Sequence, residues 1–232
     1  MVIDKKFKGL VKEDYRYVFN GDIETTENLE IDLDMRLFVT GSIKAGGSIK
    51  AGGSIEAGEF IEAGWSIEAG GFIEAGWSIE AGGFIEAGEF IEAGGFIKAG
   101  EFIKAGGSIE AGEFIEAGGS IEAGESIEAG ESIKAGWFIK AGESIKAGWS
   151  YGIIAGLSIT CKGILSFGLK AFAGICSWRE ISDEDKTITC GKLESGTIEY
   201  GILRETGVEE SDDKTQEAMR LLKEQGYKII RQ

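Results

Sequence analysis

Three residue types that shape many folds are missing or scarce in this chain of 232 residues, which has no proline, no histidine and only three cysteines. The absence of proline excludes a collagen-like triple helix, even though glycine is abundant. The absence of histidine leaves acid–base chemistry to carboxylates or thiols, and no set of nucleophile, base and orienting residue is recognisable. We therefore expect a non-enzymatic protein without catalytic, cofactor-binding or metal-binding residues.

The cysteines and the hydrophobic runs limit the class of protein further. Cys161, Cys176 and Cys190 are odd in number and lack paired motif spacing, so we expect reduced, buried thiols rather than disulfides or metal ligands. No run of about 18 apolar residues is present. The first residues, MVIDKKFKGLVKEDYR, are too polar for a secretory signal. The composition predicts a soluble, cytoplasmic protein without membrane association.

The abundant feature is a six-residue repeat. Residues 41–148 form 18 uninterrupted units of the pattern X-(Ser/Phe)-Ile-(Glu/Lys)-Ala-Gly. On a strand, Ile and Ala share one face while Ser/Phe and Glu/Lys point to the other. Glycine and the residue after it are suited to a corner. A short strand followed by a corner, repeated, predicts an all-β fold: a parallel β-solenoid (β-helix) of six-residue sides, with turns about 4.8 Å apart.

Variation between the units predicts which side chains lie inside. Ile and Ala are the same in all 18 units, as a close-packed interior requires. An exchange of Ser for Phe changes the volume too much for a packed core, so we place this position outside with Glu/Lys.

The number of sides in one turn has two interpretations. Three sides is the familiar solution for six-residue solenoids, and we favour it. However, Phe60, Phe72, Phe84 and Phe96 recur in every second unit, and stacking of like residues would then require an even number of sides. Duplication of a two-unit gene segment would give the same spacing without structural meaning.

The repeat divides the chain into four parts. These are an N-terminal cap (1–40), the regular solenoid (41–156), degenerate turns and strands (157–206) and a C-terminal tail (207–232). Caps are expected because an exposed last rung invites edge pairing.

Local patterns predict the elements outside the regular repeat. Strands are expected at 15–19, 29–34, 186–190 and 196–203. In the tail, Asp212 or Asp213 is suited to cap a helix that ends at Gly226, and residues 227–230 follow as a short strand. The tail is therefore expected to be a small α+β unit.

Acidic residues dominate the predicted surface. The repeat has 18 Glu and 7 Lys, which gives −11 of the net charge of −16. Along the axis the acidic stretch would carry a charge every 1–2 Å, roughly, similar to about 1.7 Å in duplex DNA. Stacked carboxylates repel, so folding does not require them. The predicted acidic partner-binding face is the stretch without Lys: Glu56, Glu59, Glu62, Glu68, Glu74, Glu80, Glu86, Glu89 and Glu92.

Aromatic residues form a second surface feature. Eight Phe and four Trp occupy outward or corner positions between Phe60 and Trp149. They either stack as ladders that stiffen the rod or expose an apolar stripe for a partner or for self-association. The predicted stripe consists of Phe60, Trp65, Phe72, Trp77, Phe84, Phe90, Phe96 and Phe102.

The segment GSIKAGGSIKAGGSIEAG resembles three groups of bacterial β-solenoids. Hexapeptide acyltransferases are left-handed triangular prisms, but their general base is a histidine, so the resemblance implies the fold and not the activity. Bactofilins have a similar Gly-x-Ile-x-Ala cadence and polymerise end to end. Some pentapeptide-repeat proteins mimic DNA; their period is five, so only the principle of an acidic solenoid replacing a duplex is shared.

These observations lead to two hypotheses of function. The first is an acidic solenoid that binds a basic surface of a partner protein, as a nucleic-acid mimic inhibiting a DNA- or RNA-binding defence enzyme; this would suit a phage or mobile element. Direct nucleic-acid binding is not expected, because acids outnumber bases. The alternative is a self-associating scaffold of bactofilin-like type, with homo-oligomers formed through the rod end or the C-terminal tail. A third interpretation assigns the acidic residues only to solubility.

Overall fold

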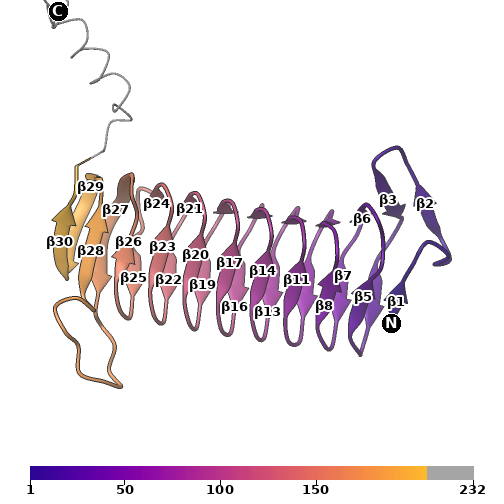
Figure 1. The fold of residues 1–232 in the computed structure, drawn as a ribbon, viewed down its shortest axis with the longest axis horizontal. Helices are drawn as coiled ribbons and strands as arrows, with labels where there is room; N and C mark the ends of the chain where they lie inside the picture. The colour runs from indigo at the N-terminus through magenta and orange to yellow at the C-terminus, as the bar shows by residue number, and fades with distance from the viewer. Residues whose placement is uncertain (208–232) are drawn as a thin grey trace, which may run out of the picture.

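The structure is a computed structural model that describes residues 1–207. The predicted helix ending at Gly226 and the strand at 227–230 lie outside the described residues. Within 1–207 there are thirty β-strands and no helix, wound into a straight parallel β-solenoid (Figure 1). The predicted fold class is therefore confirmed for this part of the chain.

Each turn of the regular solenoid has three sides, and each side is one repeat unit. A strand pairs in parallel with the strand three units further along the chain, so that Ile43 is opposite Ile61 and Ile61 is opposite Ile79. The preference for three sides is confirmed. The recurrence of phenylalanine in every second unit has no meaning for stacking, because two units advance a residue by two sides and place it on a different face.

We name the three faces after the first regular strand on each. The β7 face contains β4 (Ile23–Thr25), β7 (Ile43–Ala45), β10 (Ile61–Ala63), β13 (Ile79–Ala81), β16 (Ile97–Ala99), β19 (Ile115–Ala117), β22 (Ile133–Ala135) and β25 (Ile153–Ala155).

The β8 face contains eleven strands in order along the rod. These are β1 (Val2–Ile3), β5 (Leu29–Ile31), β8 (Ile49–Ala51), β11 (Ile67–Ala69), β14 (Ile85–Ala87), β17 (Ile103–Ala105), β20 (Ile121–Ala123), β23 (Ile139–Ala141), β26 (Ile159–Thr160), β28 (Thr187–Cys190) and β30 (Ile202–Glu205).

The β9 face begins with a hairpin and ends with two long strands. It contains β3 (Arg16–Phe19), β6 (Arg36–Val39), β9 (Ile55–Ala57), β12 (Ile73–Ala75), β15 (Ile91–Ala93), β18 (Ile109–Ala111), β21 (Ile127–Ala129) and β24 (Ile145–Ala147). Strands β27 (Ile164–Ala173) and β29 (Lys192–Tyr200) continue the ladder; β27 pairs with both β24 and β25, so it joins this face to the β7 face.

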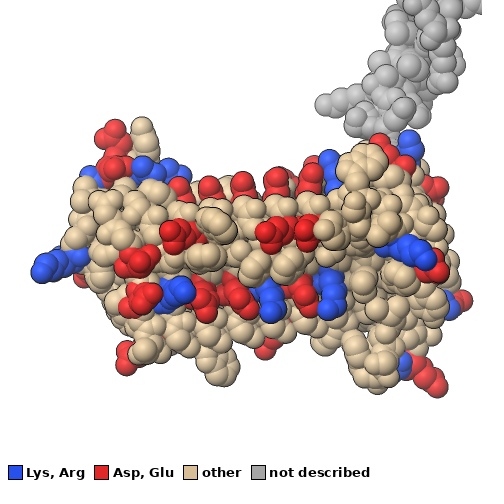
Figure 2. All heavy atoms as spheres, turned by 180° about the vertical axis from the view of Figure 1, so that it is seen from behind, with Lys and Arg blue, Asp and Glu red and all other residues tan. Residues whose placement is uncertain are grey.

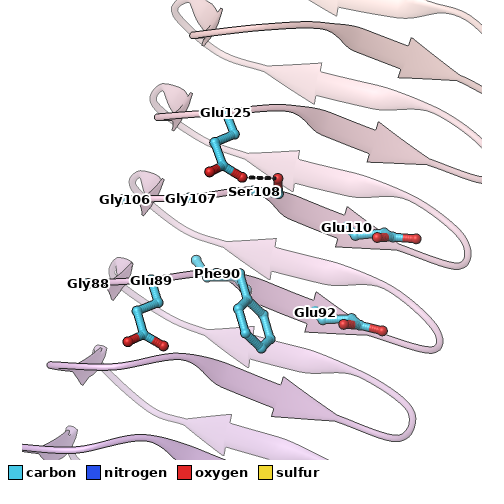
Figure 3. A pocket seen from close by; sticks show the side chains of 10 residues that line it. Gly88, Glu89, Phe90, Glu92, Gly106, Gly107, Ser108, Glu110 and Glu125 are labelled. Atoms are coloured by element: carbon cyan, nitrogen blue, oxygen red, sulfur yellow. Dashed lines mark hydrogen bonds between the residues drawn. The ribbon is translucent and has the colours of Figure 1, made fainter.

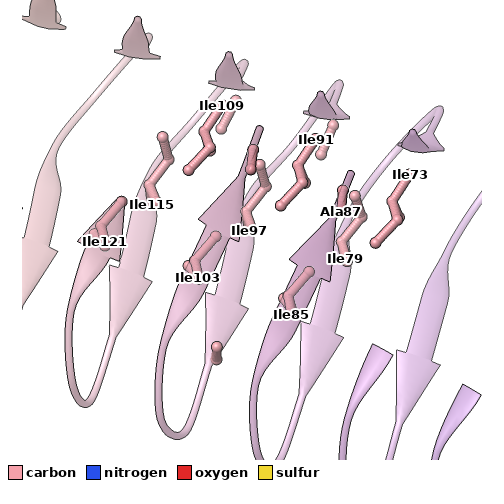
Figure 4. Close-up of a cluster of buried hydrophobic side chains, with 14 of the residues drawn as sticks. Ile73, Ile79, Ile85, Ala87, Ile91, Ile97, Ile103, Ile109, Ile115 and Ile121 are labelled. Carbon is pink, nitrogen blue, oxygen red and sulfur yellow. The ribbon is translucent and has the colours of Figure 1, made fainter. Parts of the chain in front are cut away.

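The core consists of isoleucine columns, one for each face, with alanine beside them (Figure 4). Every repeat isoleucine from Ile43 to Ile145 has 0% exposure, and the alanines from Ala45 to Ala141 are also buried. The predicted interior is confirmed, except that Ala147 is only partly buried. The Ser/Phe position lies outside this core but is not uniformly exposed, since Ser42 and Ser78 are buried.

The sixth residue of the unit is glycine because neighbouring turns come too close for a side chain. A Cβ on Gly94 would lie 2.2 Å from the carbonyl oxygen of Gly76, one turn earlier, and the sixth residue of every other regular unit except Gly52 shows the same approach. None of these repeat glycines has a left-handed φ. The requirement is therefore close packing of backbones, beyond the corner role expected from the sequence.

The solenoid is longer than the regular repeat. Ile23, Leu29 and Leu37 already pair with Ile43, Ile49 and Ile55. The ladder also continues through β25 to β30, so the predicted divisions at 40/41 and 156/157 are not structural boundaries. At the N-terminal end, β2 (Leu10–Lys12) pairs antiparallel with β3 and covers its edge, as a cap should.

The elements predicted near the ends are close to those observed. The strands expected at 15–19, 29–34 and 186–190 correspond to β3, β5 and β28. The strand expected at 196–203 is wrong, because Gly201 interrupts it with a φ of 128°. The chain turns there, and the two halves belong to β29 and β30 on different faces.

Candidate partner-binding surface

The middle residue of each strand points outward, and these residues form one row on each face. The row on the β7 face is Glu24, Lys44, Glu62, Glu80, Lys98, Glu116 and Lys134. The row on the β8 face is Glu30, Lys50, Glu68, Glu86, Lys104, Glu122 and Lys140. The row on the β9 face is Glu56, Glu74, Glu92, Glu110 and Glu128, followed by Lys146.

On the β7 and β8 faces, lysines neutralise part of the acid. The pairs on the β7 face have N···O distances of 2.8–3.5 Å and are Lys44–Glu62, Lys98–Glu80 and Lys134–Glu116. The pairs on the β8 face have distances of 2.9–3.1 Å and are Lys50–Glu68 and Lys104–Glu86. Figure 2 shows acidic and basic side chains mixed within a row along the rod, and a second row in which acids predominate.

Corner residues add to the acid of the β9 face. Seven repeat units have glutamate at the variable corner position, and six of these flank the β9 face. On the β8–β9 corner they are Glu89, Glu125 and Glu143, and on the β9–β7 corner they are Glu59, Glu113 and Glu131. Together with the row of five, the β9 face and its two corners carry eleven glutamates.

The glutamate row is electrostatically unfavourable. Partial burial, and then the neighbouring carboxylates of Glu56 and Glu92, raise the pKa of Glu74 above the ordinary value. Basic residues lie only at the ends of the row: Arg36 is 3.4 Å from Glu56, and Lys146 is 3.6 Å from Glu128. Because this repulsion does not stabilise the fold, the glutamate row requires an explanation other than folding stability.

A hollow of about 490 Å³ lies at the β8–β9 corner, beside the middle of the glutamate row (Figure 3). It opens where Gly107 takes the corner position between Glu89 and Glu125 and leaves the space of a side chain empty. Glu92, Glu110 and the ring of Phe90 line the same hollow. The hydroxyl of Ser108 donates a hydrogen bond of 3.2 Å to Glu125, which holds that carboxylate at the rim. Four carboxylates and one aromatic ring around a hollow suit a lysine or arginine side chain.

The nine glutamates predicted as one acidic face are distributed over all three faces. Glu56, Glu74 and Glu92 belong to the row on the β9 face, with Glu59 and Glu89 at its corners. The other four, Glu62 and Glu80 on the β7 face and Glu68 and Glu86 on the β8 face, pair with lysines. The expectation of one face was therefore wrong, because each successive unit places its side chains on the next face. It missed Glu110, Glu113, Glu125, Glu128, Glu131 and Glu143.

The predicted aromatic stripe is also distributed over three corners. Trp65, Phe84 and Phe102 lie on the β7–β8 corner, Phe72 and Phe90 on the β8–β9 corner, and Phe60, Trp77 and Phe96 on the β9–β7 corner. A single stripe is therefore wrong. Rings one turn apart stack face to face, with centroids 4.7 Å apart for Phe72 and Phe90, and 4.8 Å for Phe84 and Phe102. Trp65 and Trp77 remain exposed.

Residues 1–207 were also searched for reactive cysteines, metal-binding clusters and membrane-spanning helices. Cys161, Cys176 and Cys190 are free and buried, and burial raises the pKa of the Cys161 thiol to about 12. Among residues 1–207, no three Cys, Asp or Glu side chains are grouped so that they would hold a metal ion. The same residues include no helix with the length and hydrophobicity needed to cross a membrane.

Comparison with protein-family models, with curated proteins and with solved structures gave no match for this chain. The chemistry of the β9 face is therefore interpreted from its own residues.

Proposed function

We propose that this protein is a binding protein whose β9 face occupies a positively charged surface of a partner protein. The observation that supports this is the one-sided arrangement of charge. Lys44 with Lys50 and Lys98 with Lys104 occupy pairs of successive units, so they reach the β7 and β8 faces and leave the row from Glu56 to Glu128 without lysine. Lysine enters the β9 row only after its last glutamate, at Lys146. An acidic composition needed only for solubility would not require this segregation.

The density of charge favours a partner that normally binds nucleic acid. The eleven glutamates occupy six turns, or about 24 Å of axis, which is roughly one carboxylate per 2 Å. Duplex DNA has one charge per about 1.7 Å. A basic groove shaped for a duplex would meet a similar charge density on a rigid rod. Inhibition of a DNA- or RNA-binding enzyme is the specific activity we propose for this face.

Two variants with the same change in net charge test the assignment of the face. The first neutralises the β9 row with Glu74→Gln, Glu92→Gln, Glu110→Gln and Glu128→Gln. The matched control neutralises the β7 row with Glu24→Gln, Glu62→Gln, Glu80→Gln and Glu116→Gln. Each immobilised protein is incubated with host-cell lysate and eluted with a salt gradient, and the eluted proteins are identified by mass spectrometry.

The proposal expects proteins that bind the wild type and the β7 control, elute at moderate salt and are lost with the β9 variant. Competition by added duplex DNA would support nucleic-acid mimicry. If the β9 variant loses these proteins but nucleic acid does not compete with them, binding to a basic partner would be supported and nucleic-acid mimicry would be rejected. Equal loss with both variants would show that only total charge matters and would overturn the proposal.

A further inference from the structure

The charges in the outward row of the β8 face are complementary to the same row read in the opposite direction. In order along the rod, the signs are −, +, −, −, +, −, +, from Glu30 to Lys140. If two copies face each other with their rods antiparallel, Glu30 faces Lys140, Lys50 faces Glu122 and Glu68 faces Lys104. Each of these pairs occurs twice, so six of the seven positions meet the opposite charge.

We propose that two copies of this chain form an antiparallel dimer through their β8 faces, with the two-fold axis at the turn of Glu86. In a parallel dimer each residue of the row would face its own copy, and every contact would be repulsive. A shift of the antiparallel pairing by one turn places Lys50 opposite Lys104 and Glu30 opposite Glu122. The charges therefore favour one orientation and one register.

The β7–β8 corner has features that fit the same axis. In this antiparallel dimer the corner of one copy lies beside the same corner of the other. Trp65 is 70% exposed and lies one turn before the axis. A hollow of about 360 Å³ begins one turn after the axis, lined by Phe102, Gly119, Ser120 and Trp137. The symmetry therefore brings Trp65 of each copy to the level of the hollow in the other, where an aromatic anchor is most effective.

At the axis Glu86 faces its own copy, which is the one like-charge contact of the row, and aromatic rings lie beside it on the β7–β8 corner. The stacked rings of Phe84 and Phe102 lie at the axis turn and at the next turn. Across the axis, Phe102 faces the small Ser66 of the second copy, so a large residue meets a small one. Seven turns of about 4.8 Å and a side of six residues at about 3.3 Å give roughly 650 Å² per copy. This is close to the ~800 Å² per partner of a standard interface.

The β7 face has the same sequence of signs but fits a dimer less well. Its axis turn carries Trp77, so two copies of this large, 62% exposed ring would meet on the axis, where the β8 face instead places the smaller, half-buried Phe84. One turn away, Phe60 would face Phe96, which is large against large. We therefore assign the dimer to the β8 face. The β9 face remains uncovered, so this inference does not depend on the proposed function.

Charge reversal at matched positions tests the dimer by sedimentation equilibrium at low and high salt. Lys50→Glu replaces two attractive contacts of the dimer with two repulsive ones, and we expect a dissociation constant about tenfold higher or more. Lys50→Glu with Glu122→Lys should restore most of the affinity, because the pairs form again with exchanged signs. Lys44→Glu is the control: it breaks a similar ion pair in the same turn on the β7 face, so it should leave the dimer unchanged.

Cross-linking at the axis tests the geometry independently. Only a residue on the two-fold axis meets its own copy, so Glu86→Cys should give a covalent dimer with a short bis-maleimide, and Glu80→Cys on the β7 face should not. Facing sheets are about 10 Å apart, which is too far for a direct disulfide. A wild-type protein that stays monomeric at low salt would overturn the proposal. So would a dimer that Lys44→Glu weakens as much as Lys50→Glu does, or cross-linking at position 80 instead of 86.

Discussion

Replacement of the sixth residue of the repeat by alanine should have opposite effects on stability in two different units, at Gly94 and at Gly52. At Gly94 a Cβ would lie 2.2 Å from the carbonyl oxygen of Gly76. This is about 1 Å shorter than an ordinary close contact, so two turns of the rod must move apart where backbone hydrogen bonds join them. Overpacking of this kind costs about 1–3 kcal/mol. We expect Gly94→Ala to lower the free energy of unfolding by that amount.

Gly52 provides the matched control. It has the same place in its unit, but a Cβ there has nothing within 4 Å, because the turn below follows a longer path between Ile31 and Leu37. Alanine at this position reduces the conformational freedom of the unfolded chain and should stabilise the protein by about 0.4–1 kcal/mol. The two variants should therefore differ by about 1.5–4 kcal/mol.

Urea unfolding monitored by tryptophan fluorescence measures this difference, with comparison of both midpoints and slopes. The slopes should agree between the two variants. Equal stability of Gly94→Ala and Gly52→Ala would refute the explanation of the repeat glycine by close approach of the turns. A general preference for glycine at corners would then be the better account.

Three further predictions concern the core, the acidic row and the ends. Ile91→Asp buries an unpaired carboxylate and should destabilise the protein by several kcal/mol, roughly, whereas Phe90→Ser should cost far less; similar losses in a urea titration would contradict the assignment of inside and outside. Partial burial, and then the carboxylates of Glu56 and Glu92, raise the pKa of Glu74, so the folded protein binds this proton more tightly than the unfolded chain and stability falls as pH rises through that window. Glu74→Gln should therefore raise the thermal midpoint at pH 7 and lose this advantage below about pH 4, and a gain that does not change with pH would reject the cost of ionising Glu74 as its cause. Residues 41–148 alone expose open rungs at both ends and should form assemblies larger than a dimer in light scattering, whereas a stable monomer or dimer would show that the flanking turns are not needed as caps.

The local parts of the structure could be predicted from the sequence, because they depend on neighbouring residues. Ile43 and Ala45 stand two residues apart with Lys44 between them, which defines the buried side of the strand. The constancy of both residues in all units marks the core. The number of sides per turn has no local signal. A turn of two units and a turn of three units both keep the Ser/Phe position in frame, so the positions of Phe60 and Phe72 do not distinguish them.

The surface could not be assembled before the turn length was known. Glu56, Glu62 and Glu68 follow one another in sequence, yet each lies on a different face. Conversely, Glu92 and Glu110 are separated by Lys98 and Lys104 in the sequence and are neighbours in the structure. Reading the charges at every third unit is the signal that finds the acidic β9 face. The same interval shows that the lysines interrupt the rows of the other two faces.

The claim that one face of the rod is the site for positive charge is tested by carboxylate footprinting with N-acetylated decaarginine amide, a basic probe without the primary amines that carbodiimide would couple to the protein. Exposed carboxylates are labelled with an amine and a carbodiimide in the presence and absence of the peptide, and each glutamate is quantified by mass spectrometry. We expect protection of Glu74, Glu92 and Glu110, with little change at Glu62, Glu80 and Glu86 on the other two faces. Equal protection on all three faces would contradict it.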